Sequence, residues 1–227
     1  MNVKRMITLT VVFSVFYAIL KIKSTSIKNS YKEKDENGAD KLPDVIHTYG
    51  PDWSKYYHYA ETFFYIIIVL FIVYATTNKK LFVLYEIGFL LAFFYLIKIT
   101  CTLVTILPDP SGKCETKNTL GDCNELMPSG HLSSLLIILF SLWPYIDNKY
   151  WKMLFVSLIS IYSFVIIAVR NHYTIDVVIS WFVVYTIYYM SHPYMVNNCK
   201  NLQASAWYKP CFRDISYILR YNKLIQK

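Results

Sequence analysis

Long blocks of apolar residues, separated by short polar gaps, dominate the pattern along the chain. These blocks are too uniform for amphipathic helices, which would show a polar face every few residues. A helix that is apolar on all sides lies either in lipid or in a deep core. A chain of 227 residues is too short to bury six such helices in a soluble core. The pattern therefore predicts an all-α, polytopic membrane protein built as a bundle of six transmembrane helices.

A spanning helix needs roughly 20 mostly apolar residues, and the first and fourth of the six expected spans are shorter than that. The first also resembles a signal peptide, but no small-residue cleavage site follows it, which favours a retained helix. We expect the six spans to form a single integral-membrane domain over residues 1–227. The spans are Met6–Leu20, Thr62–Thr77, Leu81–Leu107, Leu132–Ile146, Met153–Val169 and Tyr173–Ser191.

The distribution of charge orients the predicted bundle. With six spans both termini lie on one side, and the segments on that side carry most of the excess of lysine and arginine. The long loops 21–61 and 108–131, on the other side, are together close to neutral. The positive-inside rule therefore places both termini and the tail 192–227 in the cytosol, and the two loops on the exoplasmic or lumenal side. The net charge of +8 then reflects topology, and no nucleic-acid partner is needed to explain it.

The cysteines give a weaker signal. Cys114 and Cys123 both lie in the second of these loops. Because that compartment is oxidising, they can form a disulfide or remain free thiols, and the sequence leaves both open. None of the five cysteines shows a metal-binding spacing such as Cys-x2-Cys, and we expect neither a metal nor another cofactor.

Two polar motifs stand at the edges of apolar blocks: PSGH at residues 128–131 and HYTID at residues 172–176. The helical hairpin between them returns the chain to the face from which it left, so His131 and His172 are expected at the same depth. His172 and Asp176 are four residues apart at a helix start and share one face. The carboxylate can then orient the imidazole and leave its other nitrogen as a nucleophile.

The first motif offers groups that suit a phosphate. Ser129 and Gly130 precede a helix, where free amides and a close approach of the backbone favour anion binding. His131 is suited to donate or accept a proton near neutral pH, and Arg170 is a two-pronged donor for phosphate oxygens. Lys98, ten residues before Pro108, pairs with an acid, holds a lipid head group or simply points into the bundle, and the sequence leaves these open. A single interfacial histidine is commonly structural, but the two motifs together, with an acid inside a span, favour function.

The chain resembles the sphingomyelin synthase family of the lipid phosphate phosphatase superfamily, and the matches appear in family order over most of the chain. Two motifs are specific: CNELMPSGH (Cys123–His131) and NHYTIDVVIS (Asn171–Ser180). Three are supportive: LPDVIH (Leu42–His47), LIKITCTLVTILPDP (Leu96–Pro110) and AWYKP (Ala206–Pro210).

The resemblance implies a six-helix enzyme of the Golgi or plasma membrane, with its site on the lumenal or exoplasmic face. Such enzymes transfer a phosphorylated head group from a glycerophospholipid, such as phosphatidylcholine, to ceramide, which releases diacylglycerol. By motif match, His172 would be the nucleophile, Asp176 its orienting acid and His131 the second catalytic histidine. Ser129, Gly130, Arg170, Lys98 and Glu125 would lie at the substrate. The oligomeric state, including a homo-oligomer, stays open.

The departures from the family pattern keep alternatives open. Asn124-Glu125 replaces the usual Gly-Asp, Pro128 replaces an aromatic residue, and Lys98 stands where arginine is common. A ceramide phosphoethanolamine synthase or an inositol phosphorylceramide synthase would share the catalytic motifs. A lipid phosphate phosphatase or phospholipase C-like hydrolase would use water as acceptor, although the Arg-Pro of the phosphatases' upstream phosphate-binding motif is missing. A transporter or scaffold without chemistry is the remaining reading, but repeated half-helices are not evident.

Overall fold

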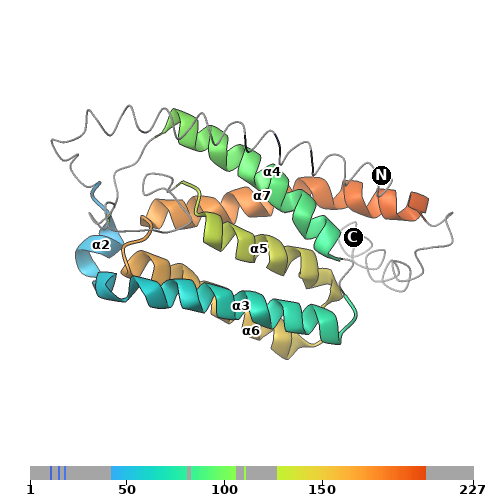
Figure 1. Ribbon diagram of the computed structural model, residues 1–227, viewed down its shortest axis with the longest axis horizontal. Coiled ribbons are helices and arrows are strands. Elements are labelled where there is room, and N and C mark those ends of the chain that lie inside the picture. The colour runs from blue at the N-terminus through green and yellow to red at the C-terminus, as the bar shows by residue number, and fades with distance from the viewer. Residues whose placement is uncertain are drawn as a thin grey trace, which may run out of the picture.

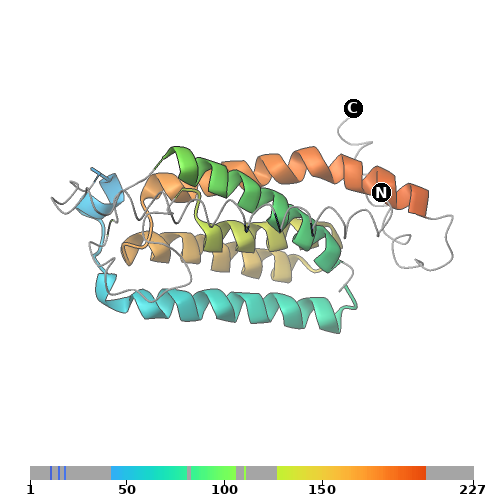
Figure 2. The ribbon, with the colours of Figure 1, turned by 45° about the horizontal axis from the view of Figure 1, so that its top comes forward.

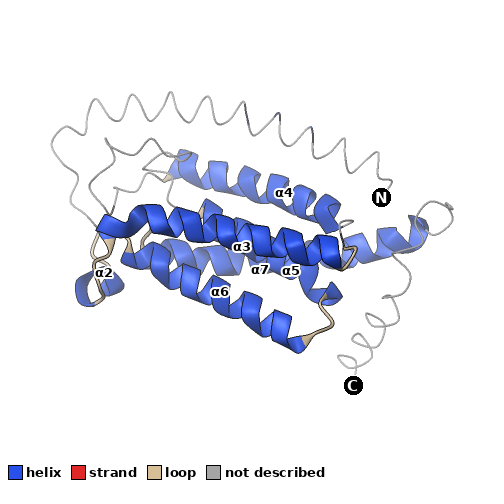
Figure 3. Ribbon diagram, turned by 60° about the horizontal axis from the view of Figure 1, so that its bottom comes forward, coloured by secondary structure: helices blue, strands red, loops and turns tan. Residues whose placement is uncertain are grey.

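The structure, a computed structural model, describes residues 42–80, 83–105, 110 and 127–202, together with the single positions 11, 15 and 18. Over these ranges the regular elements are all helices, so the all-α prediction holds there (Figure 3). The helices are α2 (Val45–Tyr49), α3 (Tyr57–Thr77), α4 (Val83–Val104), α5 (Gly130–Leu142), α6 (Lys149–Ala168) and α7 (Thr174–Leu202). Short 3-10 turns cover Ser54–Tyr56 and Trp143–Tyr145.

The helices α3 to α7 run side by side along the long axis of the molecule, and α2 lies at one end (Figures 1 and 2). Helix α5 is the centre of the bundle, because it packs against α3, α4, α6 and α7. Its leucines at positions 132, 135 and 136 have no exposed surface. A short helix surrounded by four longer ones is thus almost wholly shielded, and its start lies at the end occupied by α2.

Three helical segments are long and apolar enough to cross a membrane: Ser54–Thr77, Lys149–Ala168 and Thr174–Ser191. The apolar segment Gly130–Tyr145 is shorter. Large apolar side chains stay exposed along α3, α6 and α7, which is typical of surfaces in contact with lipid. These features support an integral membrane protein. The count of six spans stays a prediction, since α4 is not among the three and residues 6–20 fall almost entirely outside the described ranges.

Local chemistry explains where the helices depart from the expected spans. Helix α5 begins before Leu132 because Ser129 caps it, accepting a hydrogen bond from the Leu132 amide at 3.4 Å. It gives way to a 3-10 turn that contains Pro144, which has no N–H to donate. Helix α6 begins before Met153 because Asn148 Oδ1 accepts from the Tyr150 amide at 2.8 Å.

Candidate active site

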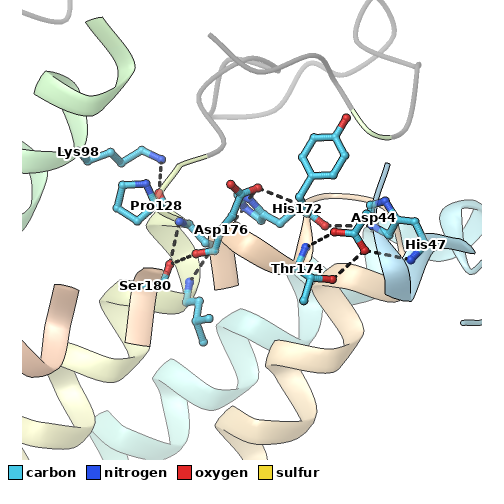
Figure 4. A network of polar contacts seen from close by, with 11 residues as sticks. Asp44, His47, Lys98, Pro128, His172, Thr174, Asp176 and Ser180 are labelled. Carbon is cyan, nitrogen blue, oxygen red and sulfur yellow. Dashed lines mark hydrogen bonds and ion pairs between the residues drawn. The ribbon is translucent and has the colours of Figure 1, made fainter. Parts of the chain in front are cut away.

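The turn between α6 and α7 carries His172, and the first turn of α7 carries Asp176, whose side chain is completely buried. Asp176 Oδ2 lies 3.5 Å from His172 Nδ1 and accepts a hydrogen bond from the Tyr173 amide at 2.9 Å (Figure 4). An ionised carboxylate can only accept, so it favours the imidazole tautomer with the proton on Nδ1. The other ring nitrogen, Nε2, then carries the free lone pair.

Ser129 stands at that second nitrogen. Its Oγ lies 3.0 Å from His172 Nε2, so the hydroxyl can donate to the lone pair. The same oxygen caps α5 by accepting from the Leu132 amide. The hairpin of α5 and α6 thus brings two residues 43 positions apart into contact, and it places the hydroxyl, the imidazole and the carboxylate next to one another.

Lys98 reaches the start of α5 from α4. Its Nζ donates to the Pro128 carbonyl at 2.9 Å, and only 9% of the residue is exposed (Figure 4). A side-chain Cβ placed on Gly130 would lie 3.6 Å from this Nζ. The positive end of a helix repels a cation and attracts an anion. An ammonium group held against the start of α5 therefore adds to the attraction of this spot for a phosphate.

His131 is the second residue of α5 and is half-buried. Its ring packs edge-on against Phe64 of α3, with 4.6 Å between ring centroids and an interplanar angle of 86°. It lies close enough to His172 and Lys98 for their charges to act on it. The structure therefore gathers both predicted catalytic histidines and Lys98 at the end where α5 and α7 begin.

Arg170 turns elsewhere. Its backbone has the left-handed φ of 61°, and its Nη2 donates to the His47 carbonyl at 2.7 Å. Its Nε lies 4.0 Å from Asp52 Oδ1. The guanidinium thus faces the α2 side of the site, and its expected contact with phosphate stays a prediction. Glu125 lies outside the described residues, as do Cys114 and Cys123, so their roles also stay predictions.

Sequence reasoning missed Ser180 as a part of this site. Its buried hydroxyl accepts from the Ser129 amide at 2.9 Å and donates to the Asp176 carbonyl at 2.7 Å. It therefore joins the start of α5 to the first turn of α7 (Figure 4). The available signal was its spacing, because Ser180 follows Asp176 by four residues and shares its helix face.

The region from residue 42 to residue 53 supplies further residues that the sequence did not assign to the site. Asp44, at the start of α2, accepts from both the amide and the hydroxyl of Thr174 at 2.7 and 2.8 Å. His47 Nε2 lies 3.2 Å from the carbonyl oxygen of His172. Asp44 precedes His47 by three residues, which is the spacing of a helix cap. This spacing predicts the start of α2, but it does not predict the contact of Asp44 with Thr174.

Comparison with known proteins gives a match over the region that contains this site. Residues 122–193 match the family model of the PAP2 superfamily C-terminal. This PAP2 region is less than half of the chain, but it contains Ser129, His172 and Asp176. No curated protein and no solved structure matches the chain.

The match of the PAP2 region is consistent with the lipid phosphate phosphatase superfamily, and it supports phosphate-group chemistry on lipids in general terms. The geometry agrees with that chemistry: an oriented imidazole, a second histidine and a buried lysine surround a helix start. Within the described ranges, no three His, Cys, Asp or Glu side chains converge on a metal-sized site.

Proposed function

We propose that the protein is a membrane-embedded transferase that moves a phosphorylated head group from a glycerophospholipid to ceramide. The contact of His172 with both Ser129 and Asp176, at 3.0 and 3.5 Å, carries this proposal. It provides an imidazole that is oriented on one side and nucleophilic on the other. The resemblance of the two histidine motifs to sphingomyelin synthases supports ceramide as the acceptor and phosphatidylcholine as the first donor to test.

In the first half of the reaction, the donor phosphate lies at the start of α5, with Lys98 beside it. The hydrogen bond between Ser129 Oγ and His172 Nε2 breaks. His172 Nε2 then attacks phosphorus, so that an N–P bond forms. The P–O bond to diacylglycerol breaks, and His131 gives a proton to the departing oxygen. Asp176 stabilises the positive charge that develops on the His172 ring, and the α5 amides with Lys98 balance the charge on the phosphoryl oxygens.

In the second half, the primary hydroxyl of ceramide attacks the phosphorus atom held on His172. His131, now neutral, removes the hydroxyl proton as the new O–P bond forms and the N–P bond breaks. The sphingophospholipid leaves, and both histidines return to their starting states. Because helix α7, which begins at the site, has exposed apolar side chains, both lipids would approach the site from the bilayer.

A hydrolase is the second candidate, and Pro128 favours it. Proline before Ser-Gly-His is closer to the lipid phosphatases than to the sphingomyelin synthases, and the match of the PAP2 region fits either branch. Such an enzyme would form the same phosphohistidine and pass it to water. The two candidates therefore differ in the acceptor and share the site.

The test is a transfer assay with the purified full chain in vesicles. Fluorescent ceramide would be supplied with phosphatidylcholine, phosphatidylethanolamine or phosphatidylinositol in separate reactions, beside the variants His172→Ala and His58→Ala. His58 is an exposed histidine near the start of α3 and serves as the matched control. We expect a ceramide phospholipid from at least one donor, lost with His172→Ala and kept with His58→Ala.

The alternative outcomes decide between the readings. Release of diacylglycerol or phosphate without any ceramide product, again dependent on His172, would establish the hydrolase. The same product yield from wild type and His172→Ala would refute catalysis by this site.

A further inference from the structure

The segment Leu42–Trp53, here called the clamp segment, is joined to the α6–α7 turn by hydrogen bonds that span more than 100 residues of sequence. The Leu42 amide donates to the Tyr173 hydroxyl at 3.3 Å. The Trp53 amide donates to the Ala168 carbonyl at 2.8 Å. The turn that carries His172 is therefore held at both ends by a segment that lies outside helices α3 to α7.

Asp44 is the strongest connection between the two. Its Oδ2 accepts from the Thr174 amide at 2.7 Å, and its Oδ1 accepts from the Thr174 hydroxyl at 2.8 Å (Figure 4). The same Oδ1 accepts from the His47 amide at 3.1 Å. Thr174 is the first residue of α7, so one carboxylate caps α2 from within and α7 from a distance of 130 residues.

His47 holds the other side of the turn. Its Nε2 lies 3.2 Å from the His172 carbonyl, which can only accept, so the ring nitrogen donates. The His47 ring also packs on Tyr173, with 5.5 Å between centroids. Arg170 donates to the His47 carbonyl at 2.7 Å and thereby ties the start of the turn to the same residue. The backbone on both sides of His172 is thus anchored to Asp44 and His47.

The electrostatics of the clamp segment agree with a held carboxylate. Burial acts to raise the pKa of Asp44, but the hydrogen bonds from Thr174 and His47 and the charge of the His47 ring outweigh it and lower that pKa. The carboxylate is therefore ionised at neutral pH. Its negative charge lies at the positive end of α7, where it stabilises the helix start.

We propose that Asp44 and His47 are positioning residues for His172: they fix the backbone around it and so place its ring between Ser129 and Asp176. The hydrogen bonds of the Asp44 and His47 side chains go to α2, to the α6–α7 turn and to Thr174, and not to the α5 start, where the phosphate would lie. Their loss should therefore slow the chemical step without changing lipid binding. A misplacement of the reacting atom by about 1 Å is enough to lower a rate on the order of 100-fold.

This inference rests on the proposed function, because it assumes that His172 is the reacting group. Its test therefore needs one readout of turnover and one that does not depend on turnover. The first is the transfer or hydrolysis assay, read as kcat and KM separately. The second is the rate at which diethyl pyrocarbonate modifies His172, measured by mass spectrometry of the purified full chain. A ring held against Ser129 presents its lone pair poorly, and a released ring should react faster.

The decisive variants are Asp44→Ala and His47→Ala, with conservative partners. We expect each to lower kcat about 10- to 100-fold with KM within about 2-fold, and to speed His172 modification several-fold. His47→Gln keeps a side-chain N–H for the His172 carbonyl and should restore most of kcat. Thr174→Val removes one hydrogen bond to Asp44, and Thr174→Ser should restore it. Thr62→Val, which changes an exposed threonine on α3, is the control and should leave both readouts unchanged.

The outcomes distinguish the positioning role of Asp44 and His47 from the proposed function. A folded Asp44→Ala protein with normal kcat and normal His172 modification overturns the positioning role. A change confined to KM overturns it as well, because it would place Asp44 at the substrate. If Asp44→Ala does not fold, the pair Thr174→Val and Thr174→Ser decides by the same criteria. If His172→Ala keeps full activity, the proposed function fails, while the modification rate still reports whether the clamp segment holds the ring.

Discussion

The site is built where two helices begin, and the two starts are made differently. Helix α5 caps itself, because Ser129 accepts from the Leu132 amide three residues later. Helix α7 is capped from far away, because Asp44 accepts from the Thr174 amide and hydroxyl. Ser180 then joins the two starts by accepting from the Ser129 amide.

The difference separates two tasks. The α5 start is built from nearby residues, and Lys98 lies beside it, where we propose that the phosphate binds. The α7 start is held by a distant segment, and on our proposal it positions His172. We therefore expect substitutions at the α5 start to change how the substrate binds. Substitutions at the α7 start should change the orientation of the nucleophile.

Asp176→Asn should give the largest effect, because it replaces the orienting carboxylate at the α7 start with a group of the same shape. An amide can donate to His172 Nδ1 and favours the wrong tautomer, so we expect activity to fall by about three to four orders of magnitude. Turnover by purified variants measures this. Asp147→Asn, at an exposed position remote from the site, is the control and should keep full activity. A loss of less than about 10-fold would contradict the orienting role.

Gly130→Ala tests whether a phosphate binds at the α5 start. The added Cβ would lie at ordinary contact distance, 3.6 Å, from Lys98 Nζ and the Tyr95 hydroxyl, so the fold should accept it. On the proposed function it would lie where a phosphate oxygen binds, and we expect activity to fall on the order of 100-fold with the thermal midpoint unchanged. Gly88→Ala on α4, where a Cβ meets nothing within 4 Å, is the matched control. It should raise the free energy of unfolding by about 0.5–1 kcal/mol and leave activity intact.

Ser129→Ala distinguishes a serine from a histidine nucleophile. If His172 attacks, the variant loses a cap and one contact, so stability should fall by about 1 kcal/mol and activity on the order of 10-fold. If the Ser129 oxygen attacked instead, activity would vanish as in His172→Ala. Denaturation and turnover of the same preparations give both numbers. Ser129→Thr keeps a hydroxyl cap and should recover the stability.

Asp44→Asn should give the smallest effect, in the pH dependence of stability. The pKa of Asp44 lies below its ordinary value of 3.8, so its stabilisation is present above that pH and is lost as the pH falls through the lowered pKa. Wild type should therefore exceed Asp44→Asn by about 1 kcal/mol at neutral pH and converge with it in strong acid. Chemical denaturation across pH measures the difference. A constant gap at every pH would contradict the charge argument.

His47 contributes a second pH range in which the free energy of unfolding should change. Burial, aided by the charge of Arg170 and opposed by Asp44, lowers the pKa of His47 below its ordinary value of 6.5. The unfolded chain then takes up a proton first, so stability should fall as the pH drops from about 6.5 toward the lowered pKa. His47→Gln should flatten this part of the curve, while His58→Gln should not.

Much of the bundle and of the candidate site follows from local pattern. Apolar blocks predict the helices, and the spacing of His172 and Asp176 predicts a shared face, because both are short-range properties of a helix. The return of His172 to the start of α5 follows from the hairpin. The sequence leaves open whether Lys98 pairs with an acid, holds a head group or points into the bundle. In the structure its Nζ donates to the Pro128 carbonyl, and its contact with a head group stays a prediction.

The rest could not be predicted because it depends on tertiary contacts. Nothing local assigns Asp44 to Thr174 or His47 to the His172 carbonyl. Arg170 looked suited to phosphate from its position two residues before His172, but its left-handed backbone turns it toward α2. Helix α7 is also longer than the apolar block that predicts it, since it continues past Ser191 to Leu202.

The dependence of α7 on Asp44 has a consequence for biosynthesis. A chain is made from its N-terminus, so the clamp segment is synthesised well before Thr174. The histidine that follows α6 has no support until the last hairpin is inserted and docks against that waiting carboxylate. On the proposed function, competence for chemistry would therefore be gained late, when a contact between distant parts of the sequence closes. A nascent or wrongly inserted chain would carry His172 without the contacts that position it.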